Sequence, residues 1–128
     1  MSDKAFCEAV LQHLNQVAPV TARAMFGGYG IYTEGVIFAL IADEVLYFKV
    51  DDSNRHDYLN AGMRPFTYEG KGKPIEMSYC QLPDAVWQDL ATLAVWVEKS
   101  ATVSRRAKKQ QKRHKASWKN QLPFAPEW

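Results

Sequence analysis

The sequence lacks most of the features that mark a membrane protein, a secreted protein or a metalloprotein. It holds only two cysteines, Cys7 and Cys80, which lie far apart and without CxxC or Cys/His ligand spacing. We therefore expect free thiols and no metal site. No apolar run approaches the roughly 18 residues that a membrane span needs, and the first residues do not resemble a secretory signal. These absences predict a cytoplasmic protein with no membrane association.

The residue combinations that carry catalysis are also missing. We find no paired carboxylates and no Ser/His/Asp or Cys/His arrangement on the predicted loops. Glycines 27, 28 and 30 do not fit a phosphate-binding loop, because they open a predicted strand and no lysine follows at a helix start. We interpret them as a bulge or tight turn. Cys80 is the one conceivable nucleophile, and its place at a strand end favours packing. The sequence thus predicts a protein without enzymatic activity or cofactor.

Charge divides the chain into two parts. Of the 128 residues, 47% are hydrophobic, enough for one domain with its own core. Residues 105–128 hold eight basic residues and one acidic residue, a net charge of +7. Residues 1–104 hold eight basic and 13 acidic residues, a net charge of −5. We therefore expect a folded domain over residues 1–104 and a basic tail over residues 105–128 that favours an anionic partner.

Short apolar runs over residues 23–50 predict an antiparallel meander. The run 36–41 is typical of a central strand, and 45–50 of its hairpin partner across a turn at 42–44. The run 29–32 leads in across a second turn at 33–35. Strict alternation directs one set of side chains into the core: Phe38, Leu40, Leu46 and Phe48.

The opposite face of the same strand is apolar as well. Ile37, Ala39 and Ile41 alternate with the inward set, so some surface beyond the intramolecular core needs a cover. A second helix could supply it, or another subunit could, and we favour a homodimer.

Three helices are predicted. Helical periodicity predicts one over residues 3–17, the cap candidates at 51–54 together with Gly62 predict a short one over 53–60, and periodicity again predicts a long helix that starts at Pro83. The first of these leaves His13 off its apolar stripe, as a solvated side chain. Between the second and third helices, residues 65–68 and 75–79 form a predicted hairpin in which Ile75, Met77 and Tyr79 point inward. The stripe of the long helix comprises Val86, Leu90, Leu93, Val97 and Ala101.

This order of elements predicts an α+β fold of two layers, with helices on an antiparallel sheet. Four blocks in the same order resemble the N-terminal domain of the TfoX/Sxy family. They are RAMFGGYGIY (23–32), FALIADEVLYFKVD (38–51), GMRPFTY (62–68) and MSYCQLP (77–83). The resemblance covers about residues 10–103. It implies the order helix, three strands, helix, two strands, helix, similar to secretion chaperones.

The resemblance also implies kinship with bacterial regulators of natural competence, which act with the cyclic-AMP receptor protein on competence promoters. Full-length members continue into a second, helical domain, and we expect this chain to be a stand-alone N-terminal domain. Two functions stay open. The first is a transcriptional co-regulator that binds a protein partner. The alternative is a protein–protein interaction module with no nucleic-acid role.

The basic tail is the candidate contact for nucleic acid or an acidic partner. Beyond residue 103 the apolar stripe ends, which predicts a fraying helix or a disordered arm that engages phosphates without reading bases. The apolar stretch 122–128 is expected to dock on the body as a strap, or to bind a partner. The contact residues that we predict are Arg105, Arg106, Lys108, Lys109, Lys112, Arg113, Lys115 and Lys119.

Overall fold

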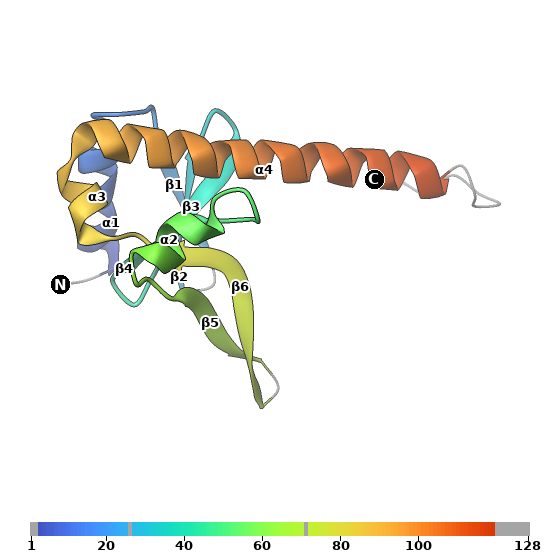
Figure 1. The fold of residues 1–128 in the computed structure, drawn as a ribbon, viewed down its shortest axis with the longest axis horizontal. Coiled ribbons are helices and arrows are strands. Elements are labelled where there is room, and N and C mark those ends of the chain that lie inside the picture. The colour runs from blue at the N-terminus through green and yellow to red at the C-terminus, as the bar shows by residue number, and fades with distance from the viewer. Residues whose placement is uncertain (1–2, 26, 71, 120–128) are drawn as a thin grey trace.

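A computed structural model describes residues 3–25, 27–70 and 72–119 of the chain. Its centre is a six-stranded antiparallel sheet in the order β1-β2-β3-β4-β6-β5, and helices pack against it (Figure 1). The predicted α+β class and antiparallel sheet are confirmed. The helices are α1 (Asp3–Leu14), α2 (Arg55–Asn60), α3 (Asp84–Gln88) and α4 (Leu90–Lys119). The strands are β1 (Thr21–Met25), β2 (Gly28–Thr33), β3 (Val36–Ala42), β4 (Val45–Lys49), β5 (Pro65–Gly70) and β6 (Lys73–Gln81).

Tight turns connect the central strands as predicted. The β2–β3 turn places Glu34 and Gly35 at φ values of 48° and 81°, and the β3–β4 turn places Asp43 and Glu44 at 49° and 60°. Positive φ at both central residues belongs to two-residue hairpin turns whose twist matches that of the strands. Four strands precede α2, where the family resemblance implies three, and the additional strand β1 pairs with β2 at one edge of the sheet.

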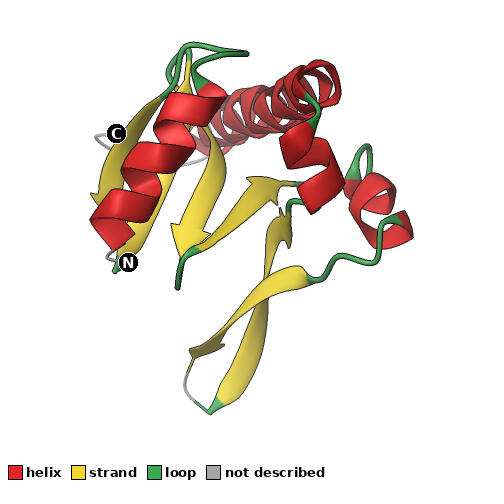
Figure 2. Ribbon diagram, turned by 90° about the vertical axis from the view of Figure 1, so that its left-hand side faces the viewer, coloured by secondary structure: helices red, strands yellow, loops and turns green. Residues whose placement is uncertain are grey.

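The helices and one face of the sheet enclose a single hydrophobic core. Phe38 and Phe48 are fully buried in it, with ring centroids 5.4 Å apart and an edge-to-face arrangement. From α4, Leu93, Val97 and Ala101 are buried against the same cluster. Figure 2 shows α3 and α4 on one side of the strands, while the β5–β6 hairpin reaches away from the body. We call the side of the sheet opposite the core its outer face.

A bulge changes which side chains of β3 face the core. Tyr32 pairs with Ile37, but the preceding Ile31 pairs with Ala39, so the register shifts by one residue. Beyond the shift, Ala39 and Ile41 face the core and are 0% and 1% exposed. Leu40 lies on the outer face and is half-buried. The predicted inward position of Leu40 is therefore wrong, as are the predicted outward positions of Ala39 and Ile41.

The long helix expected from Pro83 is interrupted at Asp89. The side chain of Asp89 accepts a hydrogen bond from the Thr92 hydroxyl at 2.8 Å, and its carbonyl accepts the first helical bond of α4 from Leu93. This cap starts a new helix, so Leu90 leaves the predicted stripe and is 40% exposed. From there α4 continues without a break to Lys119 and projects beyond the sheet (Figure 1). No helix in the described part of the chain is long and apolar enough to span a bilayer.

Three further predictions are wrong in detail. The first helix ends at Leu14 instead of residue 17. His13 is not a free surface side chain, because its ring lies 3.9 Å from that of Trp87 and its Nε2 is 2.7 Å from the Trp87 carbonyl oxygen. The predicted inward set of β6 does not face the core: Met77 and Tyr79 lie on the outer face, and Ile75 is 40% exposed. Ile75 pairs with Tyr68 near the tip of the β5–β6 hairpin, which reaches away from the body (Figure 2).

Candidate interaction surfaces

Two glycines of β2 lie beside a hollow on the outer face of the sheet. A Cβ atom on Gly28 would lie 2.0 Å from the Ile41 carbonyl oxygen, so only glycine fits there. On Gly30 a Cβ would lie 2.9 Å from the Ile37 side chain and 3.0 Å from that of Met25. Both of these side chains line the hollow. The glycines that the sequence analysis assigned to a bulge or tight turn therefore allow close packing next to this surface.

This outer-face hollow has a volume of about 630 Å³, within the usual range of ligand pockets. Its wall is apolar and comes from strands β1, β2, β3, β5 and β6. The ring of Phe66 reaches across to Tyr47, with centroids 4.7 Å apart. The side chains and backbone that line the hollow belong to Met25, Gly28, Tyr29, Ile37, Leu40, Ile41, Ala42, Phe66, Met77 and Tyr79.

Two cations lie on the outer face beside the hollow, each over a tyrosine ring. The Arg23 guanidinium carbon is 5.3 Å from the centre of the Tyr32 ring, and Lys49 Nζ is 4.9 Å from that of Tyr79. Burial lowers the pKa of the Lys49 ammonium, and burial followed by the neighbouring Tyr32 raises the pKa of Tyr79 to about 12. The hollow thus combines an apolar floor with positive charge and aromatic rings at its side, a combination that suits an apolar segment with an acidic group.

A second, smaller cleft opens on the core side, between α1 and the β3–β4 hairpin. It measures about 410 Å³. Phe6 and Val10 of α1 face Leu46 and Leu82 across it, and Asp84 and Glu44 supply carboxylates at its lining. Most apolar residues of this cleft belong to the core cluster or pack directly against it. Its residues therefore serve the attachment of α1 to the sheet.

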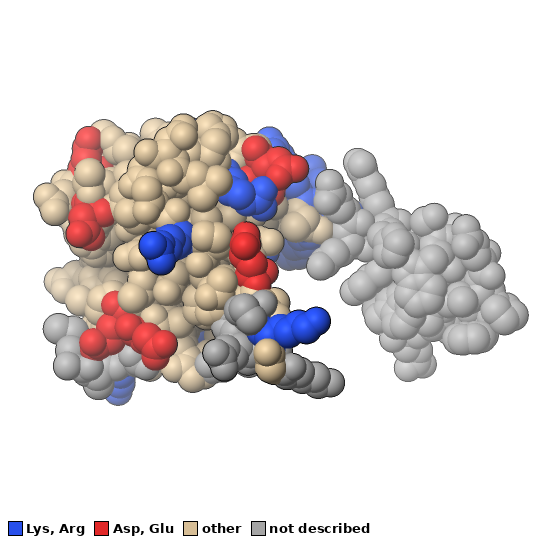
Figure 3. Space-filling view, turned by 60° about the horizontal axis from the view of Figure 1, so that its bottom comes forward, with Lys and Arg blue, Asp and Glu red and all other residues tan. Residues whose placement is uncertain are grey.

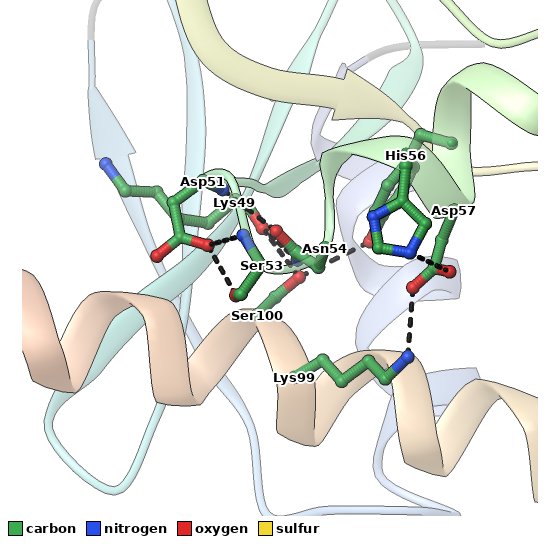
Figure 4. A network of polar contacts seen from close by, with 9 residues as sticks. Lys49, Asp51, Ser53, Asn54, His56, Asp57, Lys99 and Ser100 are labelled. Carbon is green, nitrogen blue, oxygen red and sulfur yellow. Dashed lines mark hydrogen bonds and ion pairs between the residues drawn. The ribbon is translucent and has the colours of Figure 1, made fainter.

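A polar network ties the end of β4 to α2 and α4 (Figure 4). The amide of Asn54, 1% exposed, accepts a hydrogen bond from the Asp51 backbone N–H at 2.8 Å and donates one to the Lys49 carbonyl at 3.1 Å. The Ser100 hydroxyl of α4 donates to the same carbonyl at 2.8 Å. Burial alone would raise the pKa of Asp51, but the hydrogen bonds from Ser53 and the charges of Arg106 and Arg55 hold it below its usual value. Every strong contact here is internal, so the network supports the fold.

The cysteines and histidines do not assemble into a reactive group. Cys7 and Cys80 are 4% and 0% exposed, and burial raises the pKa of both thiols. His56 lies 3.5 Å from Asp57, which also pairs with Lys99 at 2.9 Å. Among the described residues, no group of three His, Cys, Asp or Glu side chains has the arrangement of a metal site.

The predicted basic contact residues lie along α4, and the structure describes the first four of them. Arg105 does not point freely into solvent, because its guanidinium pairs with Glu34 at 3.1 Å and with Glu98 at 2.9 Å. Arg106, Lys108 and Lys109 are exposed. In the space-filling view, charged atoms form small separate groups on the body, and lysine and arginine gather towards the end of α4 that leaves it (Figure 3).

The remaining predicted contacts lie farther out. The backbone of α4 carries them as helix up to Lys119. The side chains of Lys112, Arg113, Lys115 and Lys119 lie outside the described residues, as does the whole of segment 122–128. The boundary that we predict between residues 104 and 105 stays a prediction. The structure adds that α4 crosses it as one continuous helix, which the ion pair between Arg105 and Glu34 links to the body.

Comparison with known proteins identifies a family. A family model for the TfoX N-terminal domain matches residues 12–104, which include all six strands and the part of α4 that packs on the sheet. No curated protein matches the sequence. The matched region holds the four sequence blocks and the outer-face hollow. This chain therefore belongs to the TfoX N-terminal domain family.

Proposed function

We propose that the protein is a non-enzymatic adaptor in the control of gene expression, of the kind that regulates natural competence in bacteria. Family membership supports this role, and the basic outer half of α4 is the observation that carries it. The protein partner would be a transcription factor such as the cyclic-AMP receptor protein. The basic part of α4 would hold the complex on DNA by contacting phosphates.

The spacing of the basic residues favours such a contact. Positions 105, 108, 112, 115 and 119 follow one another at intervals of three and four, and so do 106, 109 and 113. At 3.6 residues per turn, all eight positions fall on one half of the helix circumference. The helix extends about 21 Å past Arg105, because each residue adds about 1.5 Å. A one-sided row of cations on a projecting helix can follow a phosphate backbone without reading its sequence.

The expected binding is weak and depends strongly on salt. If about six phosphates are neutralised, log K falls with log salt concentration at a slope of about −5 on duplex DNA. Affinity at physiological salt then lies in the non-specific range of about 10⁻⁴ to 10⁻⁶ M. The net charge of −5 on residues 1–104 opposes closer contact between the body and DNA.

The test is a titration of labelled duplex DNA, read by fluorescence anisotropy at several salt concentrations. One variant changes the seven basic residues of α4 after Arg105 to Gln. Arg105 is kept, because its ion pair with Glu34 links α4 to the body. The matched control changes Arg64 and Lys73, two exposed cations away from α4, to Gln. We expect the first variant to lose DNA binding and its dependence on salt concentration, and the control to keep both. Equal binding by all three proteins would contradict DNA contact through α4.

A second titration addresses the protein partner. The receptor protein and a DNA fragment that carries its binding site are titrated with and without this protein. We expect tighter binding of the receptor protein to DNA in its presence. If neither DNA nor the receptor protein responds, the alternative gains support: an interaction module with no nucleic-acid role. The outer-face hollow favours that alternative, because it is a prepared surface that needs no nucleic acid.

A further inference from the structure

We infer that the outer-face hollow binds the C-terminal segment 121–128 of a second copy of this chain, so that two copies exchange their arms. This inference goes beyond the proposed function and does not depend on any contact with DNA. It rests on three observations: the chemistry of the hollow, the chemistry of the segment, and the length and direction of α4.

The chemistry of the two surfaces matches. The segment reads QLPFAPEW, with apolar residues at Leu122, Phe124 and Trp128, prolines at 123 and 126, and Glu127 as its single charged residue. Proline-containing segments bind grooves lined with aromatic rings, because the restricted backbone loses little entropy on binding. The hollow offers rings from Phe66 and Tyr79, with Tyr47 in contact with Phe66.

Charge complementarity points the same way. After Glu98, Glu127 is the only acidic residue in the chain. The cations beside the hollow, Arg23 and Lys49, lie over tyrosine rings and are not paired with a carboxylate among the ion pairs of the described residues. Lys49 in addition is half-buried. A carboxylate on an apolar segment that binds here would stabilise the charged form of the Lys49 ammonium.

The length of α4 prevents the segment as a whole from reaching the hollow of its own chain, because its central residue Phe124 falls short. Arg105 marks the point where α4 leaves the body, through its ion pair with Glu34 in the β2–β3 turn. From there α4 runs about 21 Å outward to Lys119. Phe124 follows five residues later, and five extended residues span at most about 18 Å. Even a fully reversed chain would leave Phe124 short of the β2–β3 turn, and the hollow lies farther along the strands.

Only another copy can therefore place the whole segment, with Phe124 and Trp128 together, in the hollow. In that arrangement the projecting helix is a spacer that delivers the segment to its neighbour. This proposal is an alternative to our expectation that segment 122–128 docks on its own body as a strap, and that expectation stays a prediction. Because each chain has one arm and one hollow, two copies can satisfy both contacts in a closed dimer.

Complementation between two defective chains tests the exchange. The hollow variant is Leu40→Glu, which places an acid on the half-exposed floor of the hollow and opposes Glu127. The arm variant is the double substitution Phe124→Ala and Trp128→Ala. The matched control is Val95→Glu, which puts the same acid at a position of α4 that is 52% exposed and outside the hollow.

Sedimentation velocity over the micromolar range reads the result. We expect dimers from the wild type and from the Val95→Glu control, and monomers from the hollow variant and from the arm variant alone. An equimolar mixture of the two defective chains restores a dimer, because it holds one intact arm and one intact hollow. A labelled NQLPFAPEW peptide binds the arm variant, and the Leu40→Glu substitution in the arm variant weakens that binding by at least about tenfold, or about 1.4 kcal/mol.

Each other outcome overturns the exchange. If the arm variant still dimerises, two hollows pair face to face. If the wild type is a monomer whose melting temperature falls in the arm variant, the segment docks within its own chain. A wild-type monomer that binds no peptide leaves the hollow to a different partner. If Leu40→Glu does not fold, Met77→Glu on the opposite wall of the hollow replaces it. The peptide titration with the arm variant needs no hollow variant, so it tests binding of the segment independently.

Discussion

Replacing Phe48 with alanine tests the assignment of the core most directly. Phe48 lies in β4, pairs with Ala39 on one side and Cys80 on the other, and is 0% exposed. Its ring meets that of Phe38 edge to face at 5.4 Å. The substitution removes a large apolar side chain from the point where the two halves of the sheet meet. Neighbouring strands cannot close the gap, because their spacing is fixed by backbone hydrogen bonds.

The magnitude follows from the burial and from the ring contact. Phe→Ala substitutions in cores reduce the free energy of unfolding by about 3–5 kcal/mol. Within that loss, the edge-to-face pair accounts for about 0.5–1.5 kcal/mol. Domains of this size unfold with a free energy of about 5–15 kcal/mol, so Phe48→Ala removes a large part of the total. At about 4 °C per kcal/mol, we expect the melting temperature to fall by about 12–20 °C.

Chemical denaturation followed by circular dichroism measures this loss. The matched control is Val95→Ala, at a position that is 52% exposed, which we expect to change stability by less than about 0.5 kcal/mol. A double-mutant cycle with Phe38→Ala isolates the coupling of the two rings. The assignment of the core would be refuted by equal, small losses for Phe48→Ala and Val95→Ala.

Three further predictions use the same measurement. Ile41→Asp should unfold the protein, because Ile41 faces the core, whereas Leu40→Asp should be tolerated, because Leu40 lies on the outer face. If Leu40→Asp were the more destabilising substitution, the register shift at the bulge would be contradicted. Asn54→Ala should cost about 1–3 kcal/mol, since it leaves the Asp51 N–H without its buried partner and the Lys49 carbonyl with the Ser100 hydroxyl as its remaining side-chain donor, and a near-neutral effect would contradict the network. With the pKa of Tyr79 raised to about 12, the unfolded chain releases this proton first, so the free energy of unfolding should decrease from about pH 10 to pH 12, and Tyr79→Phe should flatten that decrease.

Local turn chemistry explains why much of the fold could be predicted. The turns at 33–35 and 42–44 lie between short apolar runs, and the structure confirms both. The short helix over 53–60 was predicted from its cap residues and from Gly62. In the structure Gly62 has a φ of 78°, and it and Met63 donate hydrogen bonds back into α2. Such signals are local, so they can be read without knowing what packs against them.

The wrong predictions concern residues whose surroundings depend on a contact with a distant part of the chain. Asp89 interrupts an apolar stripe whose spacing fits an unbroken helix equally well, and only the packing of α3 and α4 distinguishes the two. Ile75 and Met77 keep the alternation of their strand, but this side of β6 belongs to the outer face, opposite the helices that would bury them. His13 finds its partner, Trp87, 74 residues along the chain. In each case the local sequence pattern fits both the predicted and the observed surroundings, and only the residue that packs against it distinguishes them.

The missed bulge and the inferred binding role of the outer face have the same cause. In a sheet with one solvated face, polar residues alternate with apolar ones, and a bulge shows as a break in that alternation. From Val36 to Ala42, β3 is apolar at every position, so a shift of one residue leaves no trace in the sequence. Ile37 and Leu40 have no core to fill, because they lie on the outer face. Apolar residues at such positions are expected where another segment covers them, and arm exchange supplies that segment. If the hollow faced only water, selection would favour polar residues at Ile37 and Leu40, and the alternation would have revealed the bulge.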